Sequence, residues 1–226
     1  MKYKIPKLIL LAVLLNFTTG TLFGQSFEGW ITYKTELLNP DSSFFPDSLF
    51  QVVMKEKFGE RRYIVSKCYY KNGLYSSEID AGNENGFRVF NPKDKLVYSW
   101  QTNSDTAITV DSQQYSDTFI EMVDAGFTDT ILGIPCKSVM VKSKRGRMTL
   151  WYNPDYFKID AKYYQGYVYE HLEQIINRLG CLPLKTEQYG LMPLNVQTAI
   201  DYKIIPVENS KFNLPDFKVI IENPVN

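Results

Sequence analysis

The residues of this chain that could do chemistry are few and scattered. Its only histidine, His171, has Glu170 and Glu173 nearby, a grouping that could orient an imidazole as a general base or form a weak metal site. One histidine does not supply the three protein ligands of a catalytic zinc, and a Ser-His-Asp triad would have to use it. No G-x-S-x-G nucleophile motif occurs. We therefore interpret His171 as a solvated residue on a helix face, and we expect no enzyme activity, no metal and no cofactor.

The three cysteines, Cys68, Cys136 and Cys181, form no C-x-x-C pair, which argues against a zinc site. In an oxidising compartment an odd number of cysteines is typical of one disulfide and one thiol, and three pairings are possible. The alternative is three buried thiols that pack as small hydrophobic groups. If the strands that start near Cys136 and Cys181 are neighbours, their Cα atoms can approach to the roughly 4.4–6.8 Å that a disulfide requires. We predict that pair, with Cys68 free.

Three other segments have both a functional and a structural interpretation. Asp80–Gly86 has the composition of a calcium loop, but its twelfth position is Asn91 and not the bidentate glutamate, so a hairpin turn is predicted. The tyrosine-rich segment 152–169 could contact lipid or a sugar, or could pack over the opening of a sheet as a lid. A basic cluster could meet an anionic headgroup or glycan, although a solvated hairpin tip is the simpler interpretation: Lys142, Lys144, Arg145 and Arg147.

Residues 1–24 have the order of a secretory signal peptide. Three lysines form a basic head, an apolar run follows over residues 8–15, and small and polar residues precede Gln25. An uncleaved membrane anchor would need about 20 mostly apolar residues. A lipid anchor would need a cysteine just after this stretch, whereas the first cysteine is Cys68. We expect a periplasmic or extracellular protein from which this segment has been removed.

Length, charge and composition narrow the possible fold classes and partners. About 200 residues follow the signal peptide, enough for one domain with its own core. The 25 basic and 25 acidic residues of the full chain cancel, and removal of the basic head leaves a mildly acidic protein, which argues against a nucleic-acid partner. Aromatic residues reach 15%, with 16 Tyr and 14 Phe. This excess favours β-structure.

Alternation of apolar and polar residues predicts a long series of antiparallel strands, clearest over residues 27–37 and 195–205. Turn residues such as Asn72-Gly73 separate the strands, and a less regular passage covers residues 115–126. Short helices are expected after Pro46 and over residues 170–179. About nine to eleven strands with one or two helices predict a mainly β (α+β) fold, a single curved antiparallel sheet that forms an incomplete barrel.

Three stretches together resemble a known family. They are Ile131-Leu-Gly-Ile-Pro-Cys136-Lys, Leu150-Trp-Tyr-Asn-Pro154 and Gly180-Cys-Leu-Pro-Leu-Lys185. With the opening strand Phe27-Glu-Gly-Trp-Ile-Thr-Tyr, this pattern is similar to that of secreted bacterial proteins allied to the outer-membrane lipoprotein-sorting (LolA-like) carriers, most of them uncharacterised. The resemblance implies a single half-barrel domain over residues 25–226, with an extended C-terminal tail. Its apolar concave face would be covered by helices and, in true carriers, shelters acyl chains.

The same alternation predicts the lining of that concave face. Six residues lie in pairs on one face of their strands and can share the inner side of one sheet: Ile31, Tyr33, Val139, Val141, Ile200 and Tyr202. Burying an acyl chain yields about 0.8 kcal/mol per methylene, so holding a lipid or acylated protein needs no catalytic residue. We expect a non-enzymatic binding or carrier protein with at most peripheral membrane contact. The alternative is a structural or protein-interaction module of the cell envelope whose sheet is filled by its own side chains.

The signal-peptide interpretation predicts processing. Intact-mass measurement of the protein isolated from its native envelope should give a chain that starts between Thr21 and Ser26, because export removes the basic and apolar segment. A mass that includes Met1 would contradict it.

Overall fold

The twelve strands of the described chain form one continuous sheet. The structure is a computed structural model that describes residues 26–39, 41–189 and 194–223; the predicted signal peptide lies outside these residues. Neighbouring strands follow the order β12-β6-β5-β4-β3-β2-β1-β11-β10-β9-β8-β7. The two end strands do not pair with each other, so the sheet is open. The predicted fold class, a curved sheet with covering helices, is confirmed.

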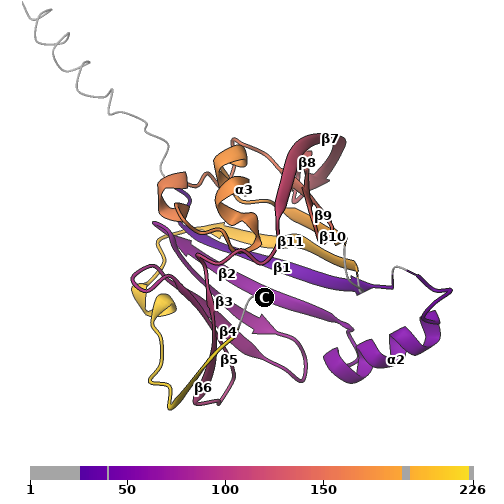
Figure 1. The fold of residues 1–226 in the computed structure, drawn as a ribbon, viewed down its shortest axis with the longest axis horizontal. Coiled ribbons are helices and arrows are strands. Elements are labelled where there is room, and N and C mark those ends of the chain that lie inside the picture. The colour runs from indigo at the N-terminus through magenta and orange to yellow at the C-terminus, as the bar shows by residue number, and fades with distance from the viewer. Residues whose placement is uncertain (1–25, 40, 190–193, 224–226) are drawn as a thin grey trace, which may run out of the picture.

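Most strands follow one another directly, and few helices lie between them (Figure 1). The first six strands are β1 (Gly29–Leu38), β2 (Tyr63–Lys71), β3 (Leu74–Asp80), β4 (Gly86–Asn91), β5 (Leu96–Gln101) and β6 (Thr106–Asp111). The others are β7 (Phe119–Ile131), β8 (Ile134–Ser143), β9 (Arg147–Tyr152), β10 (Lys185–Tyr189), β11 (Leu194–Ile204) and β12 (Val219–Glu222). The helices are α2 (Asp47–Phe58) and α3 (Leu172–Leu179), with short 3-10 turns η1 (Ala161–Tyr164), η2 (Tyr169–His171) and η3 (Asn209–Phe212).

Tight turns join the strands of the meander as the sequence predicts. Asn72 and Gly73 both have positive φ, of 47° and 80°, in the two-residue turn between β2 and β3. Such turns match the twist of the two strands and fix their register. The segment that resembles a calcium loop joins β3 to β4, and within it the Asn85 side chain accepts a hydrogen bond from the backbone of Ala81. The hairpin interpretation of Asp80–Gly86 is confirmed.

Strand β7 is much longer than the sequence predicts. The sequence predicts a less regular passage over residues 115–126, whereas β7 runs from Phe119. Its pairing with β8 shifts between Asp124 and Thr128, and Gly126 there has φ +75°. A bulge of this kind bends a strand and interrupts its alternation, which is why the periodicity of this stretch is unreadable in the sequence.

Both predicted helices are present, and each covers an apolar part of the inner face of the sheet. Figure 1 shows α2 beyond one end of the strands and α3 above the middle of the sheet. Phe50, Met54 and Phe58 of α2 pack against Ile64 and Ile79. Ile175, Ile176 and Leu179 of α3 are buried. Gly180, in the left-handed conformation, ends α3 and bonds back to Ile176.

The C-terminal tail crosses the outer face of the sheet. Lys211 pairs with Glu78 of β3, with Nζ 2.7 Å from Oε1, and the Phe217 ring stacks on Tyr98 with ring centroids 6.2 Å apart. Strand β12 then adds to the edge of β6 in parallel. The predicted extended tail is thus a docked part of the fold.

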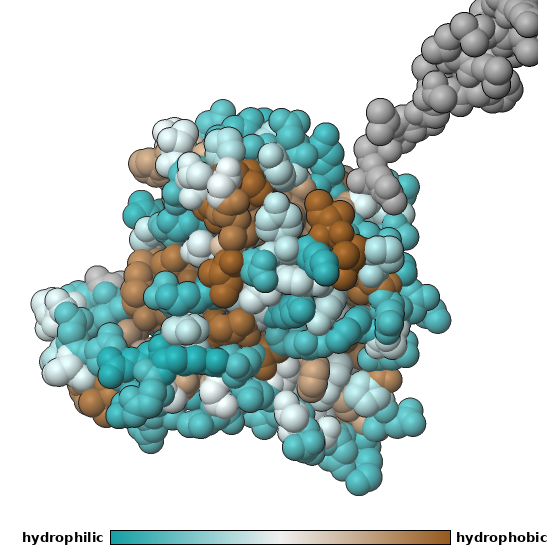
Figure 2. Space-filling view, turned by 180° about the vertical axis from the view of Figure 1, so that it is seen from behind, coloured by the Kyte–Doolittle hydropathy of each residue, from teal (hydrophilic) through white to brown (hydrophobic). Residues whose placement is uncertain are grey.

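On the face seen from behind the view of Figure 1, exposed apolar residues form separate patches. Figure 2 shows several brown patches separated by hydrophilic residues on this face. Among the described residues, no helix is long and apolar enough to cross a membrane.

The β2–β3 turn gives a test of the packing. A Cβ at Gly73 would lie 2.5 Å from the Cβ of Tyr163, whereas a Cβ at Gly133, in the β7–β8 turn, would meet nothing within 4 Å. Both glycines have similar positive φ angles, at 80° and 77°. We expect Gly73→Ala to lower the free energy of unfolding by more than Gly133→Ala, whose loss should be on the order of 1 kcal/mol from backbone strain alone. Urea titration of both variants measures the difference, and equal losses would contradict the contact.

Candidate functional site

A row of polar residues crosses the inner face of β3, β4 and β5. Ser77 lies opposite Arg88, and Arg88 lies opposite Ser99. Directly opposed residues of antiparallel strands point to the same face, with Cβ atoms about 4.5–5.5 Å apart. We call these three residues the Arg88 row. Ser77 is buried, Ser99 is half-buried and Arg88 is exposed.

An apolar row lies two residues further along the same strands. It consists of Tyr70, Tyr75, Phe90 and Val97, which oppose one another in register. Phe90 is 2% exposed. Because residues i and i+2 of a strand share a face and lie about 6.8 Å apart, the Arg88 row and this apolar row are immediate neighbours on the inner side.

Residues 160–171 lie over the apolar row, and we call this segment the tyrosine cover. The ring of Tyr167 packs on Phe90 with centroids 4.8 Å apart, and Tyr164 is buried in the main core. The backbone N–H groups of Val168 and Tyr169 both donate to the carbonyl of Ser112. The packing interpretation of the tyrosine-rich segment is therefore confirmed.

Burial controls the acid–base properties of this region. It raises the pKa of the Tyr75 and Tyr167 hydroxyls, so both stay protonated near neutral pH and can donate hydrogen bonds. The pKa of Arg88 is also raised: desolvation opposes its charge, but Tyr75 and Glu170 favour it. Arg88 is exposed to solvent although residues of the tyrosine cover are close enough to influence its charge. This is the situation of a side chain on the concave side of a curved sheet.

The end of the tyrosine cover is strained. Glu170 and His171 both have left-handed backbone angles, with φ of 53° and 61°. Non-glycine residues take this conformation at a cost of about 1–3 kcal/mol, and such strain concentrates at functional sites. Glu170 donates its backbone N–H to the Ser116 hydroxyl, which holds the turn.

His171 is not the solvated residue that we expected. It is 5% exposed, its ring lies 5.7 Å from that of Phe119, and its Nδ1 has no partner among the described residues. Burial lowers its pKa. The sequence pattern of the helix misled the prediction, because α3 begins only at Leu172 and His171 precedes it in a left-handed turn.

Five of the six predicted lining residues lie inside the molecule. Ile31 and Tyr33 belong to the larger core cluster, and the half-buried Tyr202 packs against it. Val139 and Val141 belong to a second cluster beneath α3. Ile31 and Val139 are 0% exposed. Packing of the protein's own side chains therefore fills this part of the inner face, and the residues form a core instead of an open apolar lining.

Ile200 is the exception, and that prediction was wrong. Tyr33 pairs with Ala199 and Thr32 pairs with Asp201, so Ile200 is the extra residue of a β-bulge in β11. The bulge reverses the alternation: Ala199 is buried and Ile200 is 45% exposed.

The predicted disulfide is not formed in the structure. Cys68, Cys136 and Cys181 are all free and buried. Burial, with a smaller contribution from the nearby Cys136, raises the pKa of Cys181 to about 12. Burial likewise raises the pKa of Cys68 to about 11. The alternative, three thiols that pack as hydrophobic groups, describes the structure.

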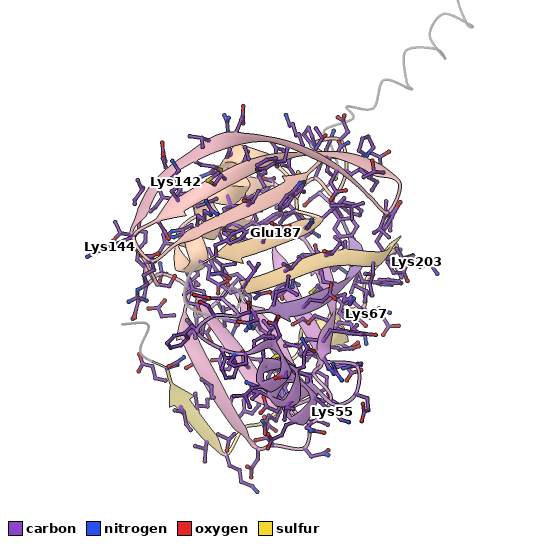
Figure 3. All side chains as sticks on the ribbon, turned by 90° about the vertical axis from the view of Figure 1, so that its right-hand side faces the viewer. Lys55, Lys67, Lys142, Lys144, Glu187 and Lys203 are labelled. Atoms are coloured by element: carbon purple, nitrogen blue, oxygen red, sulfur yellow. The ribbon has the colours of Figure 1, made fainter. Side chains whose placement is uncertain are left out.

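The basic cluster belongs to a solvated hairpin tip. Lys142 pairs with Glu121 at 2.7 Å, and the Arg145 guanidinium donates to the Ser116 carbonyl. Figure 3 shows Lys142 and Lys144 pointing outward at the end of this hairpin. These side chains lie outside the inner face.

The Arg88 row was missed in the sequence. Arg88 stands between Phe87 and Val89, so its strand does not show a clean alternation. The signal that could have found it is the Asn72-Gly73 turn. This turn fixes the register of β2 and β3, and so places Ser77 opposite the buried Cys68 on the inner face.

Comparison with known proteins gives a fold and no family. No protein-family model matches the chain, and no curated protein matches it significantly. An uncharacterized conserved protein from Thermus thermophilus has a similar structure, with a TM-score of 0.50, 10% sequence identity, and coverage of 95% of this chain and 99% of that one. This likeness shows a shared fold alone.

Two further structures have lower scores. PNGF-II gives a TM-score of 0.45 at 16% identity, over 88% of this chain and 32% of its own, so this chain spans about a third of it. LprF from Mycobacterium bovis gives a TM-score of 0.32 at 9% identity, over 80% of this chain and 88% of its own.

Thiol reactivity tests the state of the cysteines. Raised pKa values leave little thiolate at about pH 8, and the thiolate is the reactive form, so the folded protein should react slowly with Ellman's reagent. After unfolding in guanidinium without reductant, we expect three reactive thiols per chain. A single reactive thiol after unfolding would show that two cysteines are joined.

Proposed function

We propose that this chain is an exported, non-enzymatic binding protein that holds an amphipathic ligand, with an acyl chain as its apolar part, on the inner face of β2–β6. The observation that carries the proposal is the amphipathic character of this face. A covered apolar row that contains Phe90 lies directly beside a polar row with the accessible Arg88. The inner face of β8 is filled around Val139, which is 0% exposed, so the proposal places the ligand on β2–β6.

The tyrosine cover is the element that would move when a ligand enters. It is not a strand of the sheet, and it contacts the apolar row through rings such as Tyr167 on Phe90. An acyl chain that replaced this contact would gain about 0.8 kcal/mol for each buried methylene. The strained turn at Glu170 and His171 is where the cover would change conformation.

Two measurements test the proposal. Organic extraction of the purified protein, followed by mass spectrometry, should release lipid, and the delipidated protein should take up a fluorescent fatty-acid probe. Phe90→Asn should abolish uptake, because it places an amide without hydrogen-bond partners in the apolar row.

The matched control is Ile200→Asn, which introduces the same amide at an exposed bulge. It should bind the probe like the unmodified protein. Circular dichroism and thermal melting must show that both variants remain folded. A protein that releases no lipid and takes up no probe would overturn the proposal.

A second function has one observation in its favour. Ile31, Val139 and Leu184 are 0% exposed, so much of the inner face is filled without a ligand. A self-filled sheet is what a structural or protein-interaction module of the cell envelope needs. This function would follow from an empty protein in the extraction and uptake experiments, and co-purification of a specific envelope protein would support it.

A further inference from the structure

We propose that the Arg88 row binds the anionic headgroup of the ligand, a carboxylate or phosphate, while the apolar part lies under the tyrosine cover. This inference rests on the proposed function and assigns a charge class to its ligand.

Several hydrogen-bond donors lie close together around Arg88. The Arg88 guanidinium offers five N–H donors and always carries its charge. Ser77 and Ser99 flank it on the adjacent strands and add hydroxyl donors on the same face. The Tyr75 hydroxyl, protonated because burial raises its pKa, belongs to the neighbouring row. Several donors around one fixed positive charge are what an oxyanion requires.

The charge of Arg88 is not neutralised by a close contact. No ion pair or hydrogen bond joins the Arg88 side chain to any described residue, although ion pairs are common elsewhere, as between Arg61 and Asp80 or Lys211 and Glu78. Arg88 is nevertheless exposed, so a ligand can reach it. The acidic group that influences it is Glu170, which lies beyond ion-pair distance.

The Arg88 row lies beside the apolar row. Arg88 and Phe90 are two residues apart on β4, so their side chains leave the same face about 6.8 Å apart. An amphiphile could place its oxyanion on Arg88 and its first methylene groups beside Phe90. Glu170, at the strained end of the cover, would then repel the bound anion, which makes its effect on affinity opposite in sign to that of Arg88.

A pair of probes separates charge recognition from apolar binding. The probes are a fluorescent long-chain fatty acid and its methyl ester, which share the same chain and differ in the charged head. Arg88→Gln should weaken binding of the acid by roughly 10- to 100-fold, the range expected for hydrogen bonds to a charged group, and should leave the ester unchanged. Glu170→Gln should tighten binding of the acid only.

Arg147→Gln is the matched control, because Arg147 lies on the opposite face of β9 from the residues under α3 and its guanidinium packs on Tyr189. It removes the same charge and should change neither affinity. A long-chain alkyl phosphate tests the second oxyanion: binding that depends on Arg88 would extend the site to phosphate, and binding of the acid alone would restrict it to carboxylates.

The outcomes distinguish this inference from the proposed function. If the unmodified protein binds acid and ester equally well, or if Arg88→Gln weakens both equally, the headgroup assignment is wrong while the binding function stands. If neither probe binds, the proposed function itself fails. Thermal melting of Arg88→Gln shows whether a general loss of folding accounts for a change.

Discussion

The structure depends on covering the inner face of an open sheet. The twelve strands end at β7 on one side and β12 on the other, so the sheet cannot close over its own apolar residues. Elements from outside the sheet must do so, because apolar surface left in water is unfavourable. Helix α3 buries Ile176 and Leu179 against the sheet, and α2 buries Phe50 and Phe58 at its far end. The tyrosine cover closes what remains over Phe90.

This way of covering the sheet divides its inner face into two kinds of surface. Beneath α3, residues such as Val139 and Leu150 are fully buried in one apolar cluster. Across β3–β5, beside the apolar row, serines and an arginine replace apolar residues, and Arg88 is exposed although Ser77 is buried. A fully covered sheet would have no reason to keep an accessible arginine inside its curvature, since an unpaired charge there is costly to desolvate. This division is the structural basis of the proposed binding function.

Much of the fold was predictable from local pattern, and the parts that were not share one cause. Strands β1 and β11, helix α2 and the Asn72-Gly73 turn follow from alternation, helix signals and turn chemistry. The errors at Ile200 and along β7 both fall at β-bulges, where one or more extra residues reverse which side chains face inward. The alternation along one strand does not reveal such an extra residue, because the insertion is recognised only when the strand is aligned with its partner. The left-handed turn that buries His171 is hidden for a related reason, since tertiary packing and not local propensity sustains it.

The outer face of β3–β6 is held by the C-terminal segment. The C-terminal segment lies across it, with Lys211 on Glu78, Phe217 against Tyr98 and Trp100, and β12 along the edge of β6. These contacts come from residues far away in the sequence, with separations of 133 and 112 positions for two of the hydrogen bonds, so they stabilise the strands that carry the Arg88 row independently of the tyrosine cover. A cover that changes conformation needs such a support, because the strands beneath it must keep their register when it moves. In the proposed function, the docked tail would hold these strands in place while the tyrosine cover moves.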